Sequence, residues 1–134
     1  MNNRAILTVL VAGALLLGCG GSDSTGPIEP QPQPGELQVT VYGAGAVGGV
    51  VLTVTGPAIG SPTAPAGATL YYDLSGGTLH AVVVGSSMSG QVLRFPVPDV
   101  RDASQYQASL QQVAGTANQP LTVGGYSATV SLAP

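Results

Sequence analysis

The feature that most constrains the fold of this chain is an alternation of apolar and mainly polar residues that begins after Glu36. Alternation over about four to eight residues is typical of a β-strand with one buried face, because successive side chains point to opposite faces. Six segments show it. Their apolar positions are Leu37, Val39, Val41; Val50, Leu52, Val54; Leu70, Tyr72, Leu74; Leu79, Ala81, Val83; Leu93, Phe95, Val97; and Tyr126, Ala128, Val130, Leu132.

Glycine and proline separate these segments, as at Gly56-Pro57 and in the glycine-rich stretch 85–90. The segment 74–79, Leu-Ser-Gly-Gly-Thr-Leu, predicts a tight hairpin because glycine permits the positive φ that two-residue turns require. Short strands that recur about every 8–15 residues indicate an all-β fold. We therefore predict a single antiparallel β-sandwich of about seven strands, with a barrel as the alternative.

The segment 102–115 fits two structures. As a strand it places Tyr106, Ala108 and Leu110 inward. As a helix it has Asp102 as N-cap and Gln105 completing a capping box, with Gly115 at its end. We favour the strand and leave the helix open.

Our preference comes from a short motif. Asp102-x-Ser104-x-Tyr106-x-Ala108 resembles the entry to strand F of immunoglobulin-like domains, and the preceding 93–97 is similar to strand E. The resemblance implies an immunoglobulin-like sandwich with a "tyrosine corner", in which the Tyr106 hydroxyl bonds to backbone a few residues upstream. The cysteine and the tryptophan of antibody domains are absent, so the likeness is to the wider class, and cohesin-like sandwiches are a close alternative.

The N-terminal residues predict a membrane anchor. Arg4 precedes an apolar run over 5–17, the pattern of a secretory signal peptide, and this run is shorter than the ~20 apolar residues that span a bilayer. The following residues resemble the lipobox of bacterial lipoproteins, which implies cleavage before a cysteine that becomes lipidated. The matching positions are Leu16 at −3, Leu17 at −2, Gly18 at −1 and Cys19 at +1.

This resemblance divides the chain into three parts. We expect a signal peptide over 1–18, a lipidated Cys19 with a Gly/Ser/Pro-rich linker over 19–35, and the β-sandwich over 36–134. Prolines at the density of Pro-Gln-Pro-Gln-Pro favour an extended, semi-rigid spacer. Gly20 after the cysteine, in place of aspartate, implies the outer membrane rather than the inner one.

Composition excludes one class of partner. Only 7 % of residues are charged, three of them are basic, and the net charge is −3. Nucleic-acid binding requires a basic surface that neutralises phosphates, so we expect none. The expected partners are the membrane, through the N-terminal lipid, and an envelope protein or a glycan.

Several motifs suggest chemistry but are incomplete. Gly43-x-Gly45-x-x-Gly48 superficially resembles a dinucleotide-binding fingerprint, yet a β-branched strand pattern follows it where a helix is required. We interpret it as a glycine-rich turn. Zinc needs four ligands, which the single histidine and Cys19 cannot supply. Asp99 and Asp102 offer two carboxylates to calcium, which prefers six to eight oxygens. We expect no cofactor and no metal.

A hydrolase would have to use His80, the only histidine, with Asp73 across the hairpin and a serine. The candidate serines are Ser75, Ser86, Ser87 and Ser89. A triad is defined by geometry, and the strained Gly-x-Ser-x-Gly turn that exposes many nucleophiles is absent. We therefore predict a chain that is not an enzyme.

Two tyrosines suggest a ligand face. Tyr42 and Tyr71 lie on the polar register of their strands, where aromatic rings can meet a sugar. The sequence thus predicts a membrane-anchored envelope lipoprotein with a non-catalytic binding or structural β-sandwich. A carbohydrate-binding module at the cell surface is the first alternative, and a hydrolase using His80 is the second.

Overall fold

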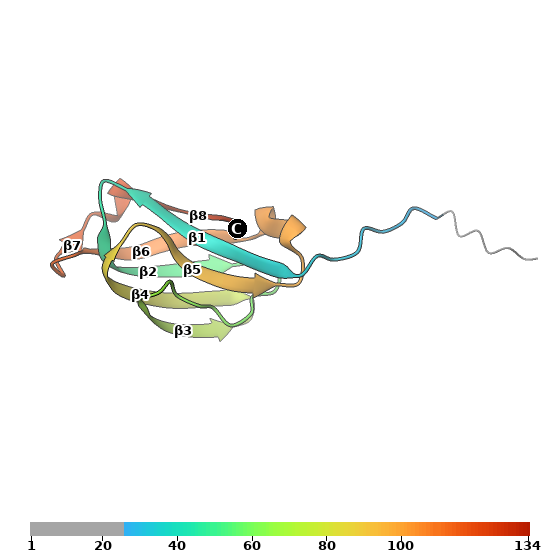
Figure 1. Cartoon of the computed structure of the whole chain (residues 1–134), viewed down its shortest axis with the longest axis horizontal. Coiled ribbons are helices and arrows are strands. Elements are labelled where there is room, and N and C mark those ends of the chain that lie inside the picture. The colour runs from blue at the N-terminus through green and yellow to red at the C-terminus, as the bar shows by residue number, and fades with distance from the viewer. Residues whose placement is uncertain (1–25) are drawn as a thin grey trace, which may run out of the picture. The chain divides into compact units, whose positions relative to one another are not determined.

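The structure, a computed structural model, describes residues 26–134. Residues Gln31–Pro134 form one compact unit, and residues 26–34 are exposed and have neither helix nor strand. The unit consists of two antiparallel β-sheets (Figure 1). The predicted all-β sandwich is confirmed.

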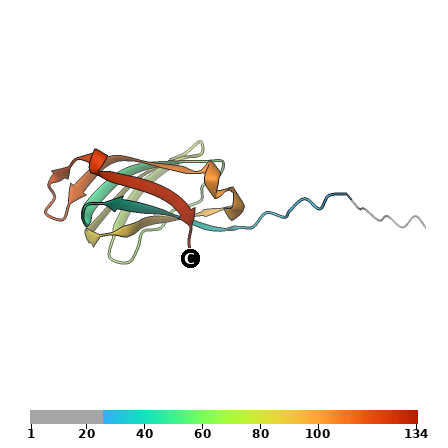
Figure 2. The ribbon, with the colours of Figure 1, turned by 90° about the horizontal axis from the view of Figure 1, so that it is seen from above.

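The three-stranded sheet has the order β5–β1–β8, and Figure 2 shows it from above, with β1 beside β8. Its strands are β1 (Gly35–Gly43), β5 (Gly90–Val97) and β8 (Tyr126–Leu132). The five-stranded sheet has the order β3–β4–β2–β6–β7. Its strands are β2 (Val47–Thr55), β3 (Thr69–Ser75), β4 (Thr78–Met88), β6 (Gln107–Gly115) and β7 (Pro120–Leu121). Two 3₁₀ helices, η1 (Val100–Gln105) and η2 (Val123–Gly125), precede β6 and β8.

The core lies between the sheets and is almost entirely aliphatic. Its largest fully buried side chains are Phe95, Leu37, Leu52, Leu79 and Leu93. Burying a leucine or phenylalanine of this size contributes about 1.5–3 kcal/mol. Because the only cysteine of the chain is Cys19, packing rather than a disulfide holds residues 26–134 together.

All six alternating segments are strands, namely β1, β2, β3, β4, β5 and β8. The apolar register of β1, β2, β4 and β5 is buried, as predicted. The same register of β3 and β8 is half-buried or exposed, since both strands lie at sheet edges. The three-stranded sheet is also narrower than the sheet that it faces.

The ambiguous segment 102–115 begins in a 3₁₀ helix and continues as a strand. Asp102 lies in η1, and β6 starts at Gln107. The register of β6 against β2 shifts between Leu110 and Gln112, which leaves Gln111 as the extra residue of a β-bulge. Leu110 and Val113 consequently both face the core, although they are three positions apart in the sequence. The bulge explains the helix-like spacing. The prediction of a strand is confirmed for 107–115 and is wrong for 102–105, which lie in η1.

The hairpin at 74–79 is also confirmed. Ser75 pairs with Thr78, and Gly76 and Gly77 form the turn with φ of 57° and 78°. Positive φ at both central residues is the signature of a type I′ turn, whose twist matches that of the strands. The Gly56 amide donates to the Gly77 carbonyl at 3.1 Å, which ties the hairpin to the end of β2.

Strand order limits the immunoglobulin resemblance to the two-layer architecture. In antibody constant domains the first two strands lie side by side in one sheet. Here β1 and β2 lie in opposite sheets, and β1 pairs with β5 and β8. The segment 93–97, compared above with strand E, therefore pairs with the first strand rather than the second.

The Tyr106 hydroxyl has a different partner from the one that a tyrosine corner implies. It donates to the carbonyl oxygen of Ala58 at 2.7 Å, 48 residues upstream, instead of a few residues upstream. Its ring is buried against Phe95, with ring centroids 5.7 Å apart. It also covers Gly56, where a Cβ would lie 2.1 Å from the ring. Asp102 is exposed in η1. Tyr106 therefore attaches β6 to the loop after β2.

Candidate binding surface

The outward side of the five-stranded sheet carries the main candidate surface, which we call the outer face. Strand register places its side chains in rows across β3, β4, β2 and β6. One row is polar and consists of Asp73, His80, Thr53 and Ser109; the next consists of Tyr71, Val82, Val51 and Gln112. The outer face thus sets a polar row beside a mainly apolar one.

His80 stands opposite Asp73, as predicted, but its hydrogen-bond partner lies on the other side. The His80 ring nitrogen Nδ1 is 3.2 Å from the Thr53 hydroxyl, on the neighbouring strand β2. Within residues 26–134, no hydrogen bond joins His80 to Asp73 or to a serine. Ser86 is six positions further along β4, about 20 Å away at a strand rise of ~3.3 Å per residue. The hydrogen-bond partner of His80 is therefore the Thr53 hydroxyl.

A shallow hollow of about 330 Å³ lies over this polar row. Its lining combines the Tyr71 ring, 63 % exposed, with hydrogen-bonding groups on four strands. These groups belong to Asp73, His80, Thr53 and Gln111. An exposed ring beside carboxylate, imidazole, hydroxyl and amide groups can stack on an apolar face of a ligand and bind its hydroxyls.

A second hollow, of about 530 Å³, adjoins the first and is mainly apolar. Val51 and Val82 line both hollows, and Val84 and Leu121 extend the apolar lining toward β7. Val82 and Val84 are 37 % and 44 % exposed, which is unusual for two alternate valines of one strand. The only sequence signal for this strip is that both registers of 81–84 are apolar.

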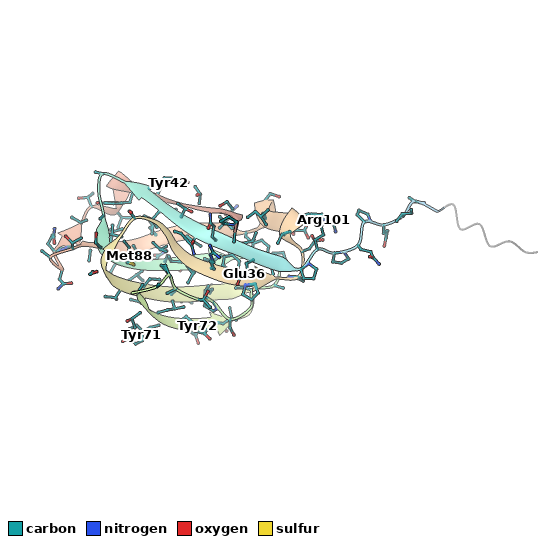
Figure 3. All side chains as sticks on the ribbon, viewed as in Figure 1. Glu36, Tyr42, Tyr71, Tyr72, Met88 and Arg101 are labelled. Atoms are coloured by element: carbon teal, nitrogen blue, oxygen red, sulfur yellow. The ribbon has the colours of Figure 1, made fainter. Side chains whose placement is uncertain are left out.

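Tyr42 does not share this surface. It lies on β1, in the three-stranded sheet, and is 57 % exposed. Figure 3 shows it at the opposite side of the sandwich from Tyr71. It lines a separate hollow of about 300 Å³, together with Met88 and the turn between β1 and β2. The two tyrosines that the sequence grouped as one ligand face are therefore on different sheets.

The glycine motif at 43–48 forms the turn between β1 and β2, as interpreted, and strand β2 follows it. A Cβ on Gly43 would lie 2.0 Å from the Tyr126 ring, and one on Gly48 would lie 2.4 Å from the Gly115 carbonyl oxygen. The glycines therefore permit close packing of neighbouring strands.

Asp99 and Arg101 form an ion pair at the start of η1. Asp99 Oδ1 accepts hydrogen bonds from the Arg101 backbone amide at 3.1 Å and from Arg101 Nε at 2.9 Å. The side-chain hydrogen bond from Arg101 holds the pKa of Asp99 well below its usual range, and the same bond raises the pKa of Arg101. Asp99 thus caps η1. Across the described residues, no three His, Cys, Asp or Glu side chains gather as a metal site would require.

The predicted lipobox, Leu16, Leu17, Gly18 and Cys19, lies outside the described residues. Between residues 26 and 134, no helix is long and apolar enough to cross a membrane. Comparison of the chain with models of protein families, with curated proteins and with solved structures gives no match.

Proposed function

We propose that this chain is a lipid-anchored lipoprotein of the outer membrane that binds a partner, without catalysis, through the outer face of its five-stranded sheet. The anchoring part rests on the sequence Leu16-Leu17-Gly18-Cys19, whose cysteine would carry the lipid. Two acyl chains are enough for stable attachment to a membrane, at about 0.8 kcal/mol per buried methylene.

One observation carries the binding part. Tyr71, Val82 and Val84 are exposed on one sheet face and border two adjoining hollows. Exposed apolar strips with a polar border are typical of interaction sites, because a soluble surface otherwise rarely groups such side chains. An envelope protein that covers the Val51–Val82–Val84 strip would remove this apolar surface from water.

Fractionation tests the anchor. Wild-type chain should partition with membranes and require detergent for extraction, whereas Cys19→Ala should remain unlipidated and be extracted without it. Membrane retention of the Cys19→Ala chain would contradict the proposed lipid attachment.

Recovery of partners from the chain's own membranes tests the binding surface. Val82→Thr keeps a β-branched side chain but replaces one methyl group with a hydroxyl, so it should weaken capture while leaving the strand intact. Tyr42→Ala is the control, since Tyr42 is also exposed, at 57 %, but lies on the other sheet. Equal recovery with both variants would argue against the outer face as the binding surface.

A glycan is the second candidate partner, favoured by the Tyr71 ring above the polar row of Asp73, His80 and Thr53. On a glycan array, Tyr71→Ala should lose the signal and Tyr42→Ala should keep it. A hydrolase activity that disappears in His80→Ala would instead support catalysis and contradict the non-catalytic proposal.

A further inference from the structure

Strand β3 is an edge strand with an unpaired side. It pairs with β4 alone, and in Figure 1 it forms the outer border of its sheet. In a two-residue hairpin the closing pair, here Ser75 and Thr78, exchanges both hydrogen bonds, and antiparallel pairs then alternate along the ladder. The backbone groups of Leu70, Tyr72 and Leu74 consequently point away from β4. They form a row of free donors and acceptors.

The other edges in the described part of the molecule are protected. Thr63 exchanges backbone hydrogen bonds with Arg94 on β5, at 2.8 and 2.9 Å, and Pro96 lies on the same edge. Strand β7 has only two residues, and β8 lies against β6 of the opposite sheet. Natural proteins blunt exposed edges with charged side chains, lysine especially, with proline or with bulges. Strand β3 has no lysine and no proline over its seven residues, Asp73 is its one charged residue, and its pairing with β4 has no register shift.

The residues of β3 on the interior face of its sheet are apolar and partly exposed. Leu70, Tyr72 and Leu74 point toward the interior side of the sheet, where Leu70 packs against the core but the narrower three-stranded sheet leaves Tyr72 and Leu74 exposed. Tyr72 is 47 % exposed and Leu74 is 37 % exposed, and Figure 3 shows Tyr72 at this border of the sheet. A strand added at this edge would gain backbone hydrogen bonds and cover apolar side chains at once.

The sequence of β3 complements itself about Tyr72. If two copies pair antiparallel with Tyr72 opposite Tyr72, Leu70 faces Leu74 and Tyr71 faces Asp73. Apolar residues then meet on one face, and on the other face a carboxylate meets a phenol hydroxyl. No two like charges stand directly opposite, a placement that destabilises sheets. This register also makes Tyr72–Tyr72 a hydrogen-bonded pair, because the Tyr72 backbone groups are free.

We propose that two copies of this chain associate through β3, in an antiparallel pairing with its two-fold axis at Tyr72, to form one continuous sheet of ten strands. The occupant of the edge is a second copy, because the sequence of β3 is complementary to itself in this register. The surface area that two paired seven-residue strands bury is smaller than the ~1,000 Å² that a stable soluble dimer usually buries. The association is therefore weak in solution, and chemical trapping is the suitable measurement.

Cysteine cross-linking of the full chain tests the register. Tyr72→Cys lies on the axis and should give a disulfide-linked dimer under mild oxidation, since paired Cα atoms are ~5.5 Å apart. Thr69→Cys and Ser75→Cys should each stay monomeric, because in this register identical positions lie about 20 Å apart. Co-expressed, these two variants face each other and should cross-link. The wild-type chain controls for Cys19.

The cross-linking is done on the membrane fraction. If the chain does not partition there, it is done on the soluble fraction, so the result does not depend on the proposed lipid anchor. The proposal is overturned if Tyr72→Cys remains monomeric, if Thr69→Cys cross-links equally well by itself, or if Tyr72→Cys cross-links only to a different protein.

A proline pair confirms that backbone pairing is responsible. Tyr72→Pro removes an amide that points away from β4, so the fold should survive while cross-linking of Thr69→Cys with Ser75→Cys falls at least about tenfold. Tyr71→Pro is the matched control, because its amide belongs to the β4 ladder and its loss should unfold the hairpin. Undiminished cross-linking in a folded Tyr72→Pro chain would contradict the pairing.

Discussion

Removing one oxygen atom tests how β6 is attached to the rest of the sandwich. Tyr106→Phe deletes the hydroxyl that donates to the Ala58 carbonyl at 2.7 Å, and it keeps the ring against Phe95 and Gly56. One such hydrogen bond contributes about 0.5–1.5 kcal/mol net. Ala58 is exposed, so water can replace the lost donor at its carbonyl. We therefore expect a loss of about 1 kcal/mol, or roughly 4 °C in Tm.

Chemical denaturation of the full chain, followed by circular dichroism, measures this loss as a lower midpoint with an unchanged slope. Tyr42→Phe is the matched control, because that ring is 57 % exposed and should change the free energy of unfolding by less than about 0.5 kcal/mol. Tyr106→Ala should cost far more, about 3–5 kcal/mol, since it empties a buried site.

Two results would refute the reasoning. If Tyr106→Phe has the same midpoint as Tyr42→Phe, the hydroxyl contributes nothing and the ring alone holds β6. A loss approaching that of Tyr106→Ala would mean that the hydroxyl maintains the conformation of the whole 56–60 loop.

Three further outcomes follow from the same structure. Gly56→Ala should destabilise the domain by more than about 2 kcal/mol, since the new Cβ would lie 2.1 Å from the Tyr106 ring. The control is Gly45→Ala, whose Cβ would meet nothing within 4 Å and should be nearly neutral; thermal melts compare the two variants. Gly77→Ala should lower the melting temperature, since it puts a side chain at φ of 78° with its Cβ 2.8 Å from the Gly56 carbonyl oxygen; an unchanged melt would contradict the type I′ turn. The pKa of Asp99 is lowered in the folded state, so its ionised form stabilises the fold fully above the unfolded pKa of ~3.9, and this stabilisation declines as the pH falls below that value. The difference in free energy of unfolding between wild type and Asp99→Asn should therefore shrink from pH 7 to pH 3. A constant difference would contradict the role of Arg101.

The local sequence pattern predicted most of the secondary structure, because every second residue of a strand with one buried face is apolar. The hairpin was readable for a similar reason, since Gly76 and Gly77 supply the turn without any distant contact. The secondary structure of the segment 102–115 was harder to predict, because one extra residue, Gln111, converts the apolar period of two into a spacing that resembles that of a helix. Nothing local marks such a bulge, whose position is determined by pairing with β2.

The candidate surface shows the same limit. The sequence placed Asp73 opposite His80 correctly, because a two-residue turn fixes that register. It could not show that Thr53 is the hydrogen-bond partner of His80, since the register of β4 against β2 is set across 27 residues of chain. It also grouped Tyr42 with Tyr71, which belong to different sheets.

By itself, the sequence determined the all-β class, the positions of six of the strands and the hairpin, because each depends on residues that are neighbours in the chain. It also supplied the whole argument for the lipid anchor at Cys19. Only the tertiary structure decided which strands pair, that Tyr106 reaches Ala58, and that β3 is left with a free edge. Strand pairing joins backbone groups, which are alike at every residue, so the order of strands depends on how the whole core packs.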